Sequence, residues 1–142
     1  MIRHALLSLC LIFASFSTWA DTLKSEPEAK QLAEKVMAQA AKGNVSGAFD
    51  VMKPYVAIPD SEFQGMSLQS KAQRDQFGSR YGKSIGYELV SEKKVGQSVL
   101  RFIYIEKTEK HALPWMFVFY KTPDGWTLNS FVWNDKIQNV FE

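Results

Sequence analysis

The residues that could act as general acids or bases are few and lie far apart in the sequence. They are Asp50, Asp135, His111, Tyr55, Tyr81 and Tyr104. A general base must lie within hydrogen-bond reach of the proton that it removes and must have a pKa near the working pH. No His–Asp pair occurs at helical or strand spacing among these residues, so the sequence specifies no catalytic dyad.

Each candidate also has a structural interpretation, which the sequence favours. Asp50 lies on the polar side of a short amphipathic segment, where a solvated or capping role is expected. His111 lies in a connection between two strands, and Asp135 follows the last strand beside Lys136, so both are expected at the surface. Tyrosines often keep a buried ring and a hydroxyl at the surface. We therefore predict no catalytic residue and favour a non-catalytic role.

Neither a metal site nor a cofactor site is indicated. The chain has two histidines, His4 and His111, and one cysteine, Cys10. Scattered carboxylates with one or two histidines do not specify a transition metal. The glycines at positions 78, 82 and 86 flank a junction between a helix and a strand, which is not the pattern of a phosphate-binding loop. We predict no metal and no cofactor.

Aromatic residues are concentrated near the end of the chain. The set comprises Trp115, Phe117, Phe119, Trp126, Phe131 and Trp133. Its simplest interpretation is a hydrophobic core. A functional alternative is the lining of an apolar pocket, with Arg101 as the polar anchor for a ligand carboxylate. In this alternative the ligand-binding residues are Arg101, Trp115, Phe117, Phe131, Trp133 and Tyr55.

The first twenty residues have the three-part layout of a secretory signal peptide. Arg3 provides the positive region, residues 5–14 are largely apolar, and the small residues Thr18 and Ala20 suit a signal peptidase. The apolar run is shorter than the roughly 20 residues that span a bilayer. Cys10 lies inside the run and is not expected to carry a lipid. We predict cleavage after Ala20 and export, to the periplasm of a Gram-negative source and otherwise outside the cell, with membrane contact only during export.

Residues 21–142 remain after cleavage and are long enough to bury a core as one domain. Loss of Arg3 lowers the formal net charge from +2 to +1. A net charge this close to zero does not indicate the excess of basic residues that is typical of a nucleic-acid-binding domain. The mature chain also lacks cysteine, which excludes a disulfide and a thiol nucleophile.

Three helices are predicted in the first half of this domain. The first begins at the capping box of Ser25 and Glu28, has apolar residues at 3-4 spacing and ends near Gly43. A short second helix covers residues 46–52. The third runs from about residue 60 to residue 81, with a cap at residue 60 or 61, and a break near Gly65 is left open because glycine weakens a helix interior.

Four strands follow, because the apolar period changes from helical spacing to alternation. They cover residues 85–90, 99–105, 113–120 and 126–133. In the last strand, Trp126 and Leu128 are out of phase with Phe131 and Trp133. An extra residue at Asn129-Ser130 would restore one face, so we predict a β-bulge there. The expected class is α+β, with the N-terminal helices packed on a curved four-stranded antiparallel sheet.

This layout resembles the nuclear-transport-factor-2-like superfamily, which includes ketosteroid isomerase and scytalone dehydratase. The similarity lies in the capped first helix, the short helix after Gly43-Asn44, the long bent strands and the ending 124–133. It covers nearly all of residues 21–142. The resemblance implies a cone that helices close over the concave sheet face, and a convex face that often forms a dimer. It implies a pocket but no reaction, because no catalytic motif matches.

The third predicted strand is apolar on both faces, with Met116, Val118 and Tyr120 on one of them. Since large exposed apolar patches usually mark interfaces, we predict a homodimer through the outer sheet face. The favoured function is an exported domain that binds a small apolar ligand or an envelope protein without catalysis. One alternative is an isomerase or dehydratase that acts on a small apolar substrate. Another is an assembly module of the cell envelope that uses the tail at 137–141.

Overall fold

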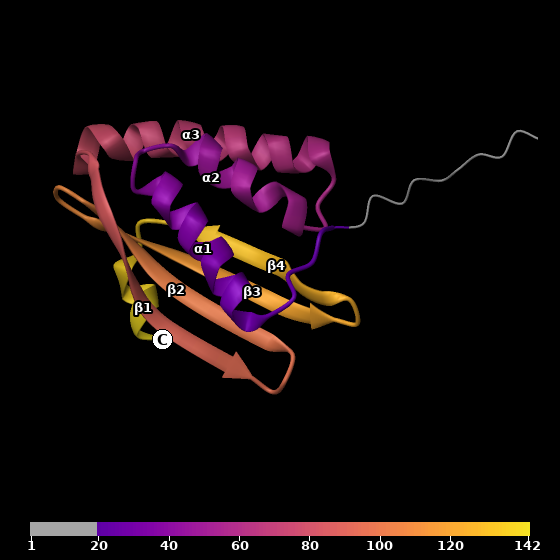
Figure 1. Cartoon of the computed structure of the whole chain (residues 1–142). Helices are drawn as coiled ribbons and strands as arrows, with labels where there is room; N and C mark the ends of the chain where they lie inside the picture. The colour runs from indigo at the N-terminus through magenta and orange to yellow at the C-terminus, as the bar shows by residue number, and fades with distance from the viewer. Residues whose placement is uncertain (1–19) are drawn as a thin grey trace, which may run out of the picture.

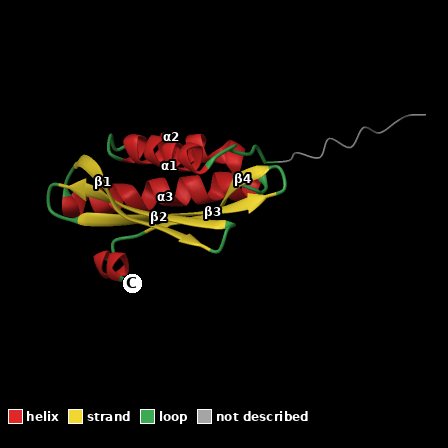
Figure 2. Ribbon diagram, turned by 60° about the horizontal axis from the view of Figure 1, so that its bottom comes forward, coloured by secondary structure: helices red, strands yellow, loops and turns green. Residues whose placement is uncertain are grey.

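The computed structural model describes residues 20–142, so the predicted signal peptide lies outside the described residues except for Ala20. The elements are α1 (Glu26–Ala40), α2 (Val45–Met52), the 3₁₀ helix η1 (Lys53–Tyr55), α3 (Asp60–Tyr81), β1 (Ser84–Val95), β2 (Val99–Thr108), β3 (Ala112–Thr122), β4 (Gly125–Trp133) and the 3₁₀ helix η2 (Ile137–Phe141). The strands form one antiparallel sheet in the order β1-β2-β3-β4. α1 and α2 lie over one face of this sheet, and η2 lies against the other (Figures 1 and 2). The predicted α+β class is therefore confirmed.

The predicted capping residues begin α1, with one difference. The Ser25 hydroxyl accepts a hydrogen bond from the Glu28 backbone N–H at 3.3 Å, as predicted. The Glu28 carboxylate accepts from the backbone N–H of Lys24 at 2.7 Å, one residue before the position that a capping box uses. Both contacts give a backbone N–H group near the N-terminus of α1 a hydrogen-bond partner, and they fix the residue at which the helix begins.

The other helices correct two details of the prediction. α2 begins at Val45 and is capped by Asn44, whose side chain accepts from the backbone N–H of Gly47. α3 is one continuous helix from Asp60, preceded by Pro59 and without a side-chain cap, so the break considered near Gly65 is wrong. No neighbouring atom lies within 4 Å of a Cβ built at Gly65. Nothing packed against this glycine therefore bends the helix.

The predicted bulge in β4 is confirmed by the register of the sheet. Val118 pairs with Ser130, and the next residue, Phe119, pairs with Leu128. Asn129 is therefore the extra residue, which returns Phe131 and Trp133 to the face that carries Leu128. β1 contains two further register shifts, near residues 85 and 90, which simple alternation did not predict.

The concave face of the sheet, which packs against α1 and α2, is covered by large side chains of β2, β3 and α2. The largest side chains that are fully buried include Trp115, Tyr104, Phe49, Phe102, Phe117 and Phe119. Trp115 stacks on Trp133 with ring centroids 5.6 Å apart, and Phe131 meets Phe49 edge to face at 5.4 Å. The core interpretation of the aromatic set is therefore confirmed.

Tyr104 is the one tyrosine hydroxyl of the described residues that is buried without a hydrogen-bond partner. The residue is 1% exposed. An unsatisfied buried hydroxyl costs about 1–3 kcal/mol, so Tyr104→Phe is expected to raise the free energy of unfolding by about that amount. Urea denaturation at pH 7 measures it, with Tyr120→Phe as the exposed control. A lower free energy of unfolding in Tyr104→Phe would contradict the conclusion that the Tyr104 hydroxyl is buried without a hydrogen-bond partner.

Tyr104 is also expected to change how the free energy of unfolding depends on pH under alkaline conditions. Burial raises the pKa of Tyr104, and the negative charges of Glu34, Tyr87 and Glu92 raise it further. An unfolded tyrosine ionises near pH ~10. The stability of the wild type therefore does not depend on this group below pH ~10 and falls as the pH rises above it, because the unfolded chain loses the proton while the folded tyrosine keeps it. Tyr104→Phe should show a smaller loss of stability between pH ~9 and ~11 than the wild type.

Candidate functional site

The residues predicted to line one ligand pocket lie on two different faces of the sheet. Trp115, Phe117 and Trp133 are in the core, and Phe131 and Tyr55 are partly buried and pack against it. Tyr55 also lines a shallow surface hollow beside α1. Arg101 is on the other face of the sheet. Leu100 and Phe102 face the helices, and side chains alternate along a strand, so the residue between them must face outward. A single pocket formed by all six residues is therefore wrong.

Arg101 instead lines a different cavity, on the convex face of the sheet. This convex-face pocket has a volume of about 260 Å³. Its lining consists of Arg101, Ile103, Pro114, Met116, Val132, Asn134, Asn139 and Glu142. Of these, only Arg101 was predicted as a ligand-binding residue. The pocket combines residues of β2, β3 and β4 with the segment that contains η2, which lies below the sheet in Figure 2.

The register of the sheet explains why these side chains meet. Ile103 pairs with Met116, and Met116 pairs with Val132, so one row of apolar side chains crosses three strands on the convex face. After β4 the chain turns back across this face. The backbone N–H of Asn134 donates to the Pro114 carbonyl at 3.3 Å, and the Asn134 side chain accepts from the Lys136 N–H at 2.9 Å. This turn sets η2 against the apolar row and closes one side of the pocket.

Arg101 is the one positively charged residue that lines this pocket, and Glu142 is the one acidic residue there. Its Nε is buried and has no hydrogen-bond partner among the described residues. None of the ion pairs found within residues 20–142 includes Arg101. Its cross-strand neighbour is Lys93, and like charges directly opposite one another in a sheet are destabilising. A guanidinium in this position is a natural attachment point for an anion.

A second polar group lies in the core and was not predicted. Glu106 is fully buried and accepts a hydrogen bond from Arg74 Nη2 at 2.5 Å, in an ion pair whose arginine side chain is 8% exposed. Ser84 donates to the same carboxylate oxygen. The Trp115 indole donates to the other oxygen at 3.0 Å. Leu100, Phe102 and Tyr104 are every second residue of β2 and face the helices, and Glu106 is the next residue in this series. This alternation is the sequence pattern that could have predicted the burial of Glu106.

This buried network lies beneath an open groove of about 650 Å³. Arg74 and Ser84 contribute to its lining, together with Lys42, Lys83, Asp75 and Glu109. Glu106 itself does not line the groove. A substrate proton could reach its carboxylate only if Ser84 or Arg74 moved away, because both carboxylate oxygens already accept hydrogen bonds. The arrangement suits a structural ion pair better than a general base.

Three of the predicted acid–base candidates do come together, at the end of α3. Tyr81 donates to the Asp135 carboxylate at 3.0 Å and stacks on the His111 ring at 4.1 Å. His111 Nε2 lies 2.9 Å from the backbone carbonyl of Asp135. All three side chains are half-buried, whereas Asp50 is exposed. These contacts join α3, the β2–β3 connection and the segment after β4, which is a structural clamp between elements.

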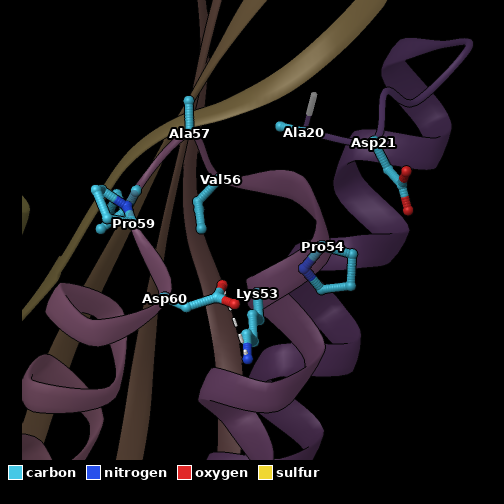
Figure 3. Close-up of a pocket in the computed structure, with 9 residues that line it drawn as sticks. Ala20, Asp21, Lys53, Pro54, Val56, Ala57, Pro59 and Asp60 are labelled. Carbon is cyan, nitrogen blue, oxygen red and sulfur yellow. Dashed lines mark ion pairs between the residues drawn. The ribbon is translucent and has the colours of Figure 1, made fainter. Parts of the chain in front are cut away.

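Another hollow, of about 600 Å³, lies beside the first described residues (Figure 3). Its walls include Pro54 and Pro59, and Lys53 and Asp60 point toward each other across it with 3.9 Å between their charged atoms. The charged side chains therefore already pair with each other. Ala20, the first described residue, forms part of its edge, and we assign no site to this hollow.

No cluster of three or more histidine, cysteine or acidic side chains within residues 20–142 could hold a metal ion. None of the helices in this part of the chain combines the length and the apolar character needed to cross a bilayer.

Comparisons with known proteins give one similarity. No family model matches the chain, and no curated protein matches it. Among solved structures, the chain is similar to the crystal structure of an NTF2-like protein of unknown function from Shewanella baltica OS155, at 12% sequence identity and a TM-score of 0.43. The match covers 79% of this chain and 97% of that one. The helices and the four-stranded antiparallel sheet agree with the α+β layout expected from the sequence.

Proposed function

We propose that this chain is an exported, non-catalytic binding domain and that its site is the convex-face pocket. The observation that carries the proposal is the guanidinium of Arg101, whose Nε is buried without a partner beside apolar walls. Most buried polar atoms in folded proteins have a hydrogen-bond partner. Ligand pockets typically combine apolar walls with a few polar groups that orient the ligand. Arg101, Asn134 and Asn139 provide such groups.

The interior of the cone supports binding over catalysis. Trp115, Phe117 and Phe119 are each 0% exposed and occupy the space over the concave sheet face. The carboxylate of Glu106 is enclosed by its own donors. An isomerase or dehydratase would need an acid or base that a substrate can reach. The interior therefore favours a domain that binds on its outer face.

Export is the second part of the proposal, and local structure near residue 21 supports it. The Asp21 N–H donates to the Pro54 carbonyl at 2.7 Å, and Leu23 and Trp126 exchange two backbone hydrogen bonds. Cleavage after Ala20 would leave these contacts and all of α1 to η2 in the mature chain. A new amino group at Asp21 could still donate to Pro54.

Native mass spectrometry of the protein purified from the envelope fraction of its own host tests both parts. We expect a chain that begins at Asp21 and carries a small molecule, and we expect Arg101→Met to lose that molecule. A full-length chain in the cytosolic fraction would contradict export. A ligand retained by Arg101→Met would contradict the site, and wild-type protein without any adduct would count against a binding function.

The same spectra test the homodimer. The exposed apolar residues that could meet a second copy on the convex side include Val95, Tyr120 and Val132, which are 44–56% exposed. η2 covers another part of this face (Figure 2). We propose a dimer through the uncovered part, and Tyr120→Lys is expected to weaken it. A strictly monomeric wild-type protein at micromolar concentration would contradict the dimer and leave the pocket proposal intact.

A further inference from the structure

We propose that the ligand of the convex-face pocket is a small carboxylate with an apolar body. Its carboxylate would bind Arg101, and its body would lie on Ile103, Met116 and Val132. This inference rests on the proposed function, because it names the chemical class that the same pocket takes. It is carried by three features of the described residues, which are the pattern of charge, the apolar row and the size of the cavity.

The charge pattern favours an anion beside Arg101. Lys93 and Arg101 are paired residues of β1 and β2, and Arg101 in turn pairs with Val118 of β3. Residues paired across antiparallel strands share a face, so two positive side chains are neighbours on the convex side. A bound carboxylate would offset their repulsion. A planar carboxylate also matches the guanidinium group, which donates two parallel hydrogen bonds to it.

The apolar row next to Arg101 distinguishes an organic acid from an inorganic anion. Ile103, Met116 and Val132 follow one another across three strands, and Val132 is 44% exposed. Pro114 adds a buried apolar wall. The cavity volume of about 260 Å³ is below the roughly 300–1,000 Å³ of pockets for drug-sized ligands. The body of the ligand is therefore small, on the scale of one ring or a short alkyl chain.

Glu142 sets a further condition on binding. It lines the same pocket and is exposed, and its side-chain carboxylate would repel a bound anion. Glu142→Gln removes that negative charge and keeps the size of the side chain. We therefore expect this variant to bind a carboxylate more tightly than the wild type does, by about 2- to 5-fold for one exposed charge.

Titration of the processed protein with benzoate, hexanoate, benzamide and inorganic phosphate tests the proposal, with calorimetry and amide chemical shifts as readouts. Benzoate and hexanoate are expected to bind, whereas the neutral benzamide and the compact phosphate bind at least ~10-fold more weakly. Arg101→Met is expected to lower benzoate affinity by about 10- to 100-fold, the effect of losing a charged hydrogen-bonding partner. Lys93→Gln should have a smaller effect in the same direction.

The control variant is Arg80→Met, which removes an exposed arginine of α3 and should leave benzoate affinity unchanged. Thermal unfolding of each variant shows whether it is folded. Equal binding of benzoate and benzamide would overturn the carboxylate assignment while the pocket remained a binding site. Unchanged benzoate affinity in Arg101→Met would overturn both the assignment and the site. No binding of any probe would also overturn the carboxylate assignment. Host-purified protein without an adduct would then overturn the proposed function as well.

Discussion

Glu106→Gln is expected to lower the free energy of unfolding by about 3–5 kcal/mol, the usual effect of removing one partner of a buried ion pair. The substitution keeps the shape of the side chain but leaves the charge of Arg74 without its counter-ion. Arg74 is 7% exposed and Glu106 is 0% exposed, so water cannot readily replace the lost charge. Ser84 and Trp115 would also lose a charged acceptor.

Urea denaturation followed by tryptophan fluorescence measures this effect. Glu88→Gln is the matched control, because Glu88 belongs to an exposed ion pair with Lys107 at 3.7 Å, and exposed pairs contribute about 0–1 kcal/mol. A double variant, Arg74→Met with Glu106→Gln, should be more stable than Glu106→Gln alone since it removes the uncompensated charge. A loss below ~1 kcal/mol in Glu106→Gln would show that the pair does not hold α3 on the sheet.

The sequence predicted the elements of the fold well because their signals are local. The alternation of Trp126 and Leu128, followed by the opposite phase of Phe131 and Trp133, located the bulge to the residue pair that contains it. The side-chain cap at Ser25 located the start of α1. Element boundaries differed where the local signal was weak. α3 carries a sparse apolar stripe and no side-chain cap, and its glycines suggested a break that does not occur.

The candidate site was predicted only in part, because its parts are brought together by strand register. Arg101 was assigned to the aromatic residues, although its phase relative to Leu100 and Phe102 places it on the other face. Val132 is remote from Arg101 in sequence, and the β2–β3 and β3–β4 registers bring it to the same side, where Lys93 lies opposite Arg101 across the β1–β2 hairpin. Asn139 and Glu142 enter only because the chain turns back after β4.

Inserting one alanine between Ser130 and Phe131 is expected to abolish cooperative unfolding of the domain. Asn129 already provides the extra residue that puts Phe131 and Trp133 in phase with Leu128, and a second extra residue shifts the register by one and turns every following side chain to the opposite face. Phe131 would leave its contact with Phe49. Trp133 would leave Trp115 and lose its hydrogen bond to Ser70, which is 3.1 Å long. Loss of one large aromatic side chain from a core costs about 3–5 kcal/mol.

The loss of two such side chains approaches the whole stability of a small domain, which is about 5–15 kcal/mol. Near-ultraviolet circular dichroism and urea denaturation measure the outcome, and no sigmoidal transition is expected for the insertion. Asn129→Ala is the control, because Asn129 is exposed and the substitution keeps the number of residues in the strand. Its free energy of unfolding should stay within about 0.5 kcal/mol of the wild type. An insertion variant that unfolds like the wild type would show that β4 can accommodate a second extra residue and still place Phe131 and Trp133 in the core.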